Sequence, residues 1–282
     1  MQDFADHQLY KSEGTPPPSN ADKRTRTWLI IVVAVIFLGI AGYTVRSCQQ
    51  GSNSTQGETA SPPVLMEEPL GALGGVADPI TLPELDKSDA LVRKLLGDLS
   101  SHPSLNKWLI TDNLIRQFVV VVANIAEGIT PAPHLSYLRP SSKFSIVKDG
   151  RSLQLDPTSY KRYDLTAEIF SSLDTVKTVN LYATLKPRID EAYLDLGSPD
   201  TTFDQILEQS IIRLLDTPIL KDPVSLHRQG IGYIFANPEI ENLTDAQKQY
   251  LRFGSRNMGL ANQKLREMGL ALGIPEDRLP IP

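Results

Sequence analysis

The pattern of apolar and polar positions divides the chain into four parts. Residues 28–45 are 18 consecutive positions without a charged side chain. As an α-helix this run would be about 27 Å long, which matches the hydrocarbon core of a bilayer. It is also longer than the apolar core of a cleavable signal peptide. We therefore predict a transmembrane helix at 28–45, between a disordered cytoplasmic tail at 1–27 and a flexible linker at 46–80, with a helical domain at 81–282.

Basic residues flank this apolar run mainly on its N-terminal side. Lys23, Arg24 and Arg26 precede it closely, whereas Arg46 is followed by no Lys or Arg until Lys87. Lys and Arg near a membrane span are retained on the cytoplasmic side. We therefore expect a single-pass protein of the bacterial inner membrane, with its N-terminus in the cytoplasm and its C-terminal domain in the periplasm.

Apolar residues recur at helical spacing through most of the predicted domain. Helices are expected at 86–99, 103–125, 157–173, 175–196, 199–216 and 244–272. Asp156-Pro157 is predicted to be the N-cap and first position of a helix, Ser198-Pro199 is a predicted helix start, and Thr244 with Gln247 is a predicted capping box. Within the second helix, Phe118–Ala123 is apolar on every face, which predicts burial on all sides. A buried strand at Val119–Val122 is the alternative.

Two other regions carry β-forming residues around turn residues. Lys143–Asp156 is predicted to be a β-hairpin that turns at Asp149-Gly150. Val224–Leu226 and Tyr233–Phe235 are expected as short strands separated by a glycine-containing loop. The predicted fold class is therefore mainly α with one or two small β-hairpins, as a single globular domain behind an N-terminal transmembrane helix.

Charge and cysteine content narrow the classes of function. The net charge is −5 and no basic run is longer than Lys23-Arg24, so no nucleic-acid partner is predicted. We expect charged residues to be spread evenly over a solvated surface. Cys48 is the single cysteine, which excludes a disulfide within the chain. It is interpreted as a spacer residue near the membrane, with an intermolecular disulfide in a homodimer or acylation as alternatives.

Short motifs give little support for catalysis or for a cofactor. HExxH, GxSxG, GxxxxGK and CxxC do not occur, and the histidines lack metal-ligand spacing, so neither a cofactor nor a metal is expected. Ser104 and Lys107 form an SxxK pattern, which in penicillin-binding enzymes places a serine one turn from an activating lysine. Those enzymes also carry a KTG element, but Val179 follows Lys177-Thr178 here. A polar first turn of a helix is the simpler interpretation, and a non-enzymatic role is favoured.

The candidate binding residues are Tyr160, Arg162, Tyr163 and Asp164. Tyr and Arg are enriched in binding surfaces, because they combine contact area with directional hydrogen bonds. On a helix, Tyr160 and Tyr163 would share one face, with Asp164 beside it. The alternative is structural, with Tyr163 in the core and an ion pair between Arg162 and Asp164 on the surface.

Several stretches of the domain together resemble the motifs of a known family. They are Leu82–Val92, Asn113–Val119, Leu155–Asp164, Ala192–Gly197, Tyr233–Leu243 and Asp245–Gly254. On these motifs, residues 80–270 resemble the bacterial domain-of-unknown-function family 3014. The resemblance implies a proteobacterial, membrane-anchored envelope protein. It implies no activity, because the family has no assigned catalytic residues.

The anchor, the linker and the absent motifs lead to one main hypothesis. We expect a membrane-tethered periplasmic module that binds or scaffolds another component of the cell envelope, without catalysis. Its expected partners are the membrane, through residues 28–45, and an envelope protein or peptidoglycan. The alternatives are a cell-wall hydrolase or acyltransferase with an unrecognised site, and a ligand-sensing domain.

Overall fold

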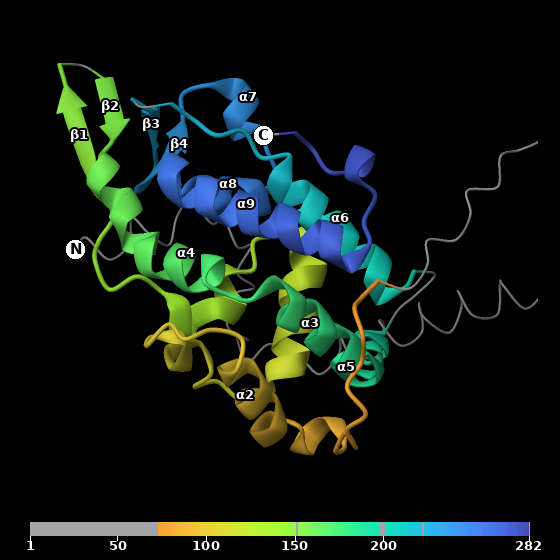
Figure 1. The fold of residues 1–282 in the computed structure, drawn as a ribbon. Coiled ribbons are helices and arrows are strands. Elements are labelled where there is room, and N and C mark those ends of the chain that lie inside the picture. The colour runs from red at the N-terminus through yellow and green to blue at the C-terminus, as the bar shows by residue number, and fades with distance from the viewer. Residues whose placement is uncertain (1–72, 151, 198–200, 222, 282) are drawn as a thin grey trace, which may run out of the picture. The chain divides into compact units, whose positions relative to one another are not determined.

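The computed structural model describes residues 73–150, 152–197, 201–221 and 223–281, which form a helical domain with one small sheet (Figure 1). Among these residues, no helix has the length and apolar character needed to span a bilayer. The predicted transmembrane run and Cys48 lie outside the described residues, so both stay predictions.

Four long helices organise the domain, and shorter elements surround them. The long helices are α3 (Leu114–Glu127), α5 (Thr175–Leu194), α6 (Phe203–Leu215) and α9 (Gly254–Leu272). The short helical elements are η1 (Leu85–Lys87), α2 (Asp89–Gly97), η2 (Leu105–Trp108), η3 (Ala132–Leu138), η4 (Pro157–Tyr163), α4 (Asp164–Ser171), α7 (Pro238–Glu241), α8 (Asp245–Leu251) and η5 (Glu276–Arg278). Helices α3, α5 and α6 pack against one another, and α9 contacts α4, α5, α6 and α8.

The first hydrophobic core lies between the long helices. It includes Val119 and Val122 of α3, which are 0% and 6% exposed and helical, so the strand alternative for this segment is wrong. The predicted burial of this segment on all sides is also wrong, because Phe118 is 38% exposed. The neighbouring helices do not close over that side of α3. The Phe118 ring instead packs edge-on against Phe203, with ring centroids 5.6 Å apart.

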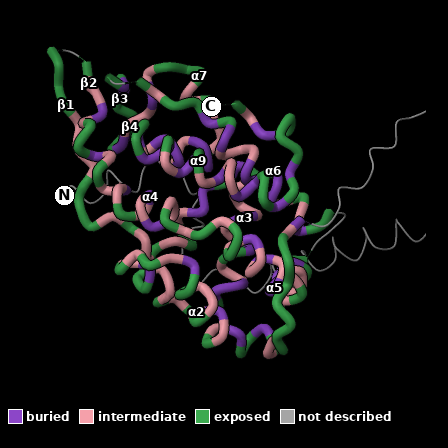
Figure 2. Tube along the Cα trace, in the orientation of Figure 1, coloured by how far each residue is buried: buried purple, intermediate pink, exposed green. Residues whose placement is uncertain are grey.

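Four short strands form one antiparallel sheet in the order β1-β2-β3-β4. They are β1 (Ile146–Asp149), β2 (Ser152–Leu155), β3 (Ser225–Gln229) and β4 (Gly232–Phe235). Both predicted hairpins are confirmed, and pairing of β2 with β3 joins them, with Leu153 opposite Leu226. Gly150 and Gly230 supply positive φ angles of +57° and +58° at the two turns. The residues at the hairpin tips are exposed (Figure 2).

A second hydrophobic core lies between the sheet and the C-terminal helices. Its buried members include Leu155, Leu226, Phe235, Tyr250 and Met258. Leu155, Leu226 and Phe235 belong to strands of the sheet, whereas Tyr250 belongs to α8 and Met258 to α9. The sheet is therefore attached to the helical body through α8 and α9.

The structure corrects several predicted helix boundaries. The predicted helix at 103–125 is the short element η2 followed by α3, which begins only after Asn113. Helix α6 begins after Thr202, which forms a capping box with Gln205, and not at Ser198-Pro199; residues 198–200 lie outside the described part. The predicted helix at 244–272 is two helices, because Gly254 has a φ of +74°, which few other residues adopt. The predicted capping box of Thr244 with Gln247 is confirmed at the start of α8.

The chain joins the packed domain at Leu73, inside the stretch predicted to be linker. Leu73 is 4% exposed, and its N–H donates to the Asp204 carboxylate at 3.2 Å. Further on, the Asp78 N–H donates to the Thr184 hydroxyl at 2.9 Å. Residues 73–78 therefore belong to the folded domain. The acceptors for their backbone N–H groups lie on distant helices, which the composition of a small-residue segment cannot indicate.

Candidate functional site

The predicted binding residues lie on η4 and at the start of α4, directly after β2. Asp156 caps η4 as predicted, because its carboxylate accepts the Thr158 N–H at 2.9 Å. This backbone hydrogen bond is the main reason why the pKa of Asp156 lies below its ordinary value. The cap fixes the direction in which η4 leaves the first hairpin.

Two of the predicted residues are used as packing surface for the start of α9. Tyr163 is 7% exposed, and its ring stacks on Phe253 with centroids 4.7 Å apart. The Tyr160 ring lies against Gly254, where any Cβ would come within 2.3 Å of the Tyr160 Cγ. Gly254 therefore serves two purposes, since it also supplies the positive φ that separates α8 from α9.

Asp164 is also bound by α9. Asn257 is 1% exposed, and its Nδ2 donates to the Asp164 carboxylate at 2.8 Å and to the Tyr160 carbonyl at 3.2 Å. Arg256 lies 3.6 Å from the same carboxylate. Tyr160, Tyr163 and Asp164 thus have contacts inside the domain, as the structural alternative expects for Tyr163.

Arg162 connects this packed group to the sheet. Its guanidinium carbon lies 5.5 Å from the centre of the Tyr163 ring and 5.6 Å from the centre of the Phe144 ring. Its Nε donates to the Ser159 carbonyl at 2.9 Å. Phe144 in turn lies 6.0 Å from Tyr233 of β4. A guanidinium stacked on aromatic rings in this way is held in one orientation, which lowers the entropy lost when it binds an anion.

The sequence around Arg162 is more basic than the rest of the chain. Residues 139–163 contain six Lys or Arg and two Asp, a net charge of +4 in a chain of −5. The predicted even spread of charge is therefore wrong for this segment. Lys148, Lys161 and Arg228 are exposed, and none of them forms an ion pair with a residue that the structure describes.

We call these neighbouring cations and rings the hairpin surface. It consists of Phe144, Lys148, Lys161, Arg162, Arg228 and Tyr233. The strand register places Lys148 opposite Leu153 and Leu153 opposite Leu226, so Arg228, two residues beyond Leu226, lies on the same face of the sheet. That face is buried near α8 and α9 and exposed near the hairpin tips.

Sequence reasoning missed five members of this surface. Phe144, Lys148 and Lys161 lie in the basic segment, so a count of charges along the chain would have drawn attention to them. Arg228 and Tyr233 could not be found in that way, because they reach the site through the pairing of β2 with β3. No local pattern predicts a pairing between strands so far apart in the chain.

The SxxK motif does not acquire the geometry of an activated serine. In the described structure, the Ser104 N–H donates to Nδ1 of His102 at 3.2 Å, and no hydrogen bond joins the Ser104 hydroxyl to Lys107. Lys107 is exposed. Within the residues that the structure covers, no group of three or more His, Cys, Asp or Glu side chains could hold a metal ion.

Fold and site together define a mainly helical domain with a four-stranded antiparallel sheet and a basic, aromatic surface at the hairpins. The model of the family described as "Protein of unknown function (DUF3014)" matches residues 114–269, more than half of the chain. The chain belongs to this family, which confirms the resemblance seen in its motifs. No curated protein and no solved structure matches the chain. The matched range begins with α3, ends in α9 and contains the whole hairpin surface.

Proposed function

We propose that this protein is a membrane-tethered binding module of the bacterial cell envelope, and that the hairpin surface binds an anionic partner. The observation that carries the proposal is the set of exposed cations on the two hairpins and on η4, Lys148, Arg228 and Lys161, together with the stacked guanidinium of Arg162 on η4. Cations with no ion-pair partner of their own attract an acidic surface and speed its encounter. The partner that fits is an acidic envelope protein, with the carboxylates of peptidoglycan peptides as the alternative source of charge.

The aromatic members support the same proposal. Arg and Tyr are frequent at the energetic centres of interfaces, where an ordered side chain loses little entropy on binding. Arg162 is ordered by its two rings, and Tyr233 and Phe144 continue that row towards the sheet. The surface thus combines ordered aromatic and guanidinium groups with exposed positive charge.

The location of the module is proposed from the sequence. The apolar run at 28–45 would anchor it, and the basic residues before the run would keep the N-terminus in the cytoplasm. An alkaline phosphatase fused after Pro282 should then be active. A fluorescent protein that folds only in the cytoplasm should be dark at the same position. The reverse pair of results would contradict the proposed orientation.

Site-specific crosslinking tests the binding surface. A photo-crosslinking amino acid would replace Ile231, which is 48% exposed in the turn between β3 and β4, and, as the matched control, Val176, which is 67% exposed on α5. We expect adducts from position 231 in cells and far weaker adducts from position 176. Digestion of the sample with a peptidoglycan hydrolase separates a protein partner from a cell-wall partner. Adducts that are equally strong at both positions, or present at 176 alone, would contradict the proposal.

A further inference from the structure

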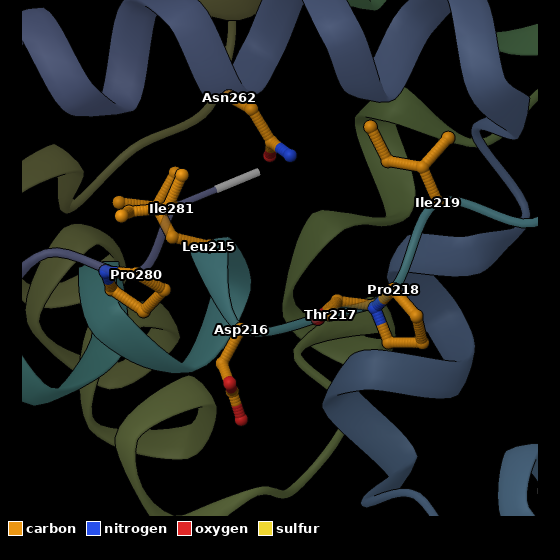
Figure 3. A pocket seen from close by; sticks show the side chains of 8 residues that line it. All are labelled: Leu215, Asp216, Thr217, Pro218, Ile219, Asn262, Pro280 and Ile281. Atoms are coloured by element: carbon orange, nitrogen blue, oxygen red, sulfur yellow. The ribbon is translucent and has the colours of Figure 1, made fainter.

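A cavity lies at the C-terminal end of α6, and it shares no lining residue with the hairpin surface (Figure 3). Its volume is about 230 Å³. Five apolar side chains line it, namely Leu215, Pro218, Ile219, Pro280 and Ile281. The volume is roughly eight times that of a water molecule in the liquid, which is room for an aliphatic side chain with its peptide unit.

Asn262 of α9 supplies the main polar group of the cavity. It is 4% exposed, and its amide points into the cavity (Figure 3). Its Oδ1 accepts the Tyr250 hydroxyl at 2.6 Å. That distance is typical of an O–H···O hydrogen bond and short for N–H···O, which supports this orientation of the amide. Nδ2 donates to no residue that the structure describes, and it is not one of the fully buried atoms without a partner, so water reaches it and a ligand's oxygen would replace that water as the acceptor.

Asp216 adds a negative charge at the rim. It follows the last residue of α6, where the helix dipole is also negative, and it is exposed. No Lys or Arg lines the cavity. The rim therefore disfavours an anion and favours an N–H group or an ammonium.

We propose that this cavity binds a peptide segment with an aliphatic side chain. The side chain lies among Pro218, Ile219 and Pro280, the adjacent carbonyl accepts from Nδ2 of Asn262, and the neighbouring N–H or ammonium lies on the side of the negative C-terminal end of α6. An acyl chain would displace the water at Nδ2 of Asn262 without replacing its hydrogen bond. A sugar would find no aromatic ring and few polar groups to bind its hydroxyls. This binding site is separate from the proposed anion-binding role of the hairpin surface.

Titration of the full-length chain, labelled with ¹⁵N-asparagine, tests this site. The probes are leucinamide, N-acetylleucinamide and isocaproic acid, which keeps the aliphatic chain but lacks the amide. Leucinamide should shift the side-chain amide signal of Asn262 and saturate at millimolar concentration, because small ligands in small cavities bind weakly. N-acetylleucinamide should bind several-fold more weakly, and Asp216→Asn should reduce that difference, because Asp216 supplies part of the negative charge at this end of α6. Isocaproic acid should cause no shift.

Paired variants control for nonspecific effects. The test variant is Ile219→Glu, because Ile219 lines the cavity and is 40% exposed. The control variant is Ile231→Glu, because Ile231 is similarly exposed, at 48%, but lies outside the cavity. The first should weaken leucinamide binding by about tenfold or more, because a charged group replaces an apolar wall, and the second should leave it unchanged. Absence of a saturable shift at Asn262 with either amide would overturn the proposal. So would an equal shift with isocaproic acid, or an equal loss in both variants. Crosslinking at the hairpin surface does not depend on any of these results.

Discussion

The helical body and the hairpin surface use the same kinds of cation in opposite ways. In the helical body, Lys186 lies 2.9 Å from the Asp204 carboxylate, and Lys264 lies 2.8 Å from Glu267. On the hairpin surface, Lys148 and Lys161 are exposed and form no ion pair within the described structure. The presence of a basic residue therefore does not identify a binding site. What distinguishes the two regions is whether the charge already has an internal partner.

Asp204 shows how closely the charges of the helical body are tied to folding. Its side chain is 14% exposed and accepts three donors: the Tyr182 hydroxyl at 2.5 Å, the Lys186 amine at 2.9 Å and the Leu73 N–H at 3.2 Å. These contacts join α5, α6 and the segment that enters the domain. A carboxylate in such a position is costly to remove. It is also not available to bind a partner, because donors inside the domain already occupy it.

The largest expected effect lies where the two regions meet. Gly254→Ala should destabilise the protein by about 3 kcal/mol, because Ala must adopt a positive φ and its Cβ would come within 2.3 Å of Tyr160. Gly259→Ala is the control within α9, where the new Cβ meets nothing within 4 Å. It should be neutral or stabilising by about 0.5–1 kcal/mol. Urea unfolding of both variants measures the difference, and a shift of the same sign and size in both would contradict this account of the junction.

The next largest effect concerns the internal charge. Asp204→Ala should cost about 2–3 kcal/mol, since it leaves the Tyr182 hydroxyl and Lys186 without their shared acceptor. Asp190→Ala is the matched control, because Asp190 lies 3.2 Å from the same Lys186 but is 45% exposed. It should cost less than about 1 kcal/mol. Equal losses in urea unfolding would mean that burial does not separate the two carboxylates.

Tyr182 gives the same region a dependence on pH. Burial, and then the hydrogen bond to Asp204, raise the pKa of Tyr182 above its ordinary value of 10.0. The folded chain therefore keeps a proton that the unfolded chain releases. The free energy of unfolding is therefore unaffected by the titration of this group below pH 10. Above pH 10 it falls by about 1.4 kcal/mol per pH unit. Tyr182→Phe should reduce that slope, measured by urea unfolding between about pH 9 and 11. Tyr250 should maintain part of this slope, because burial also raises the pKa of Tyr250. An unchanged slope in Tyr182→Phe would contradict the assignment.

The smallest effect on stability is expected at the hairpin surface. The substitutions Lys148→Glu, Lys161→Glu and Arg228→Glu should each change the free energy of unfolding by less than about 0.5 kcal/mol, because exposed charges without ion pairs contribute little to folding. Urea unfolding of the triple variant provides the measurement. A loss comparable to that of Asp204→Ala would show that these cations have structural partners.

Local patterns in the sequence predicted most helices and both hairpins, because these elements depend on neighbouring residues. The capping box of Thr244 and the cap of Asp156 were found for the same reason. The division of the last predicted helix at Gly254 was missed, since a single glycine inside a helical pattern does not reveal its φ angle. The amide of Asn262 was missed because its cavity forms only when α6, α9 and the C-terminal segment come together.

Of the four predicted binding residues, the proposed hairpin surface contains Arg162 alone. The contacts that hold Tyr160, Tyr163 and Asp164 inside the domain come from Phe253 and Asn257, which lie far along the chain and which a local pattern does not reveal. Arg162 alone extends from this packed group towards the exposed cations of the hairpins. Sequence patterns identify residue types suited to binding, but packing decides which of them face solvent.

One measurement tests the central claim most directly: the yield of in-cell crosslinks from position 231 after two matched sets of charge reversals. The first set is Lys148→Glu, Lys161→Glu and Arg228→Glu. The second is Lys94→Glu, Lys107→Glu and Lys221→Glu, whose lysines are also exposed and form no ion pair with described residues. Both sets change the net charge equally. We predict that the adduct disappears in the first set and persists in the second. An equal yield in the two sets would contradict the assignment of binding to the hairpin surface.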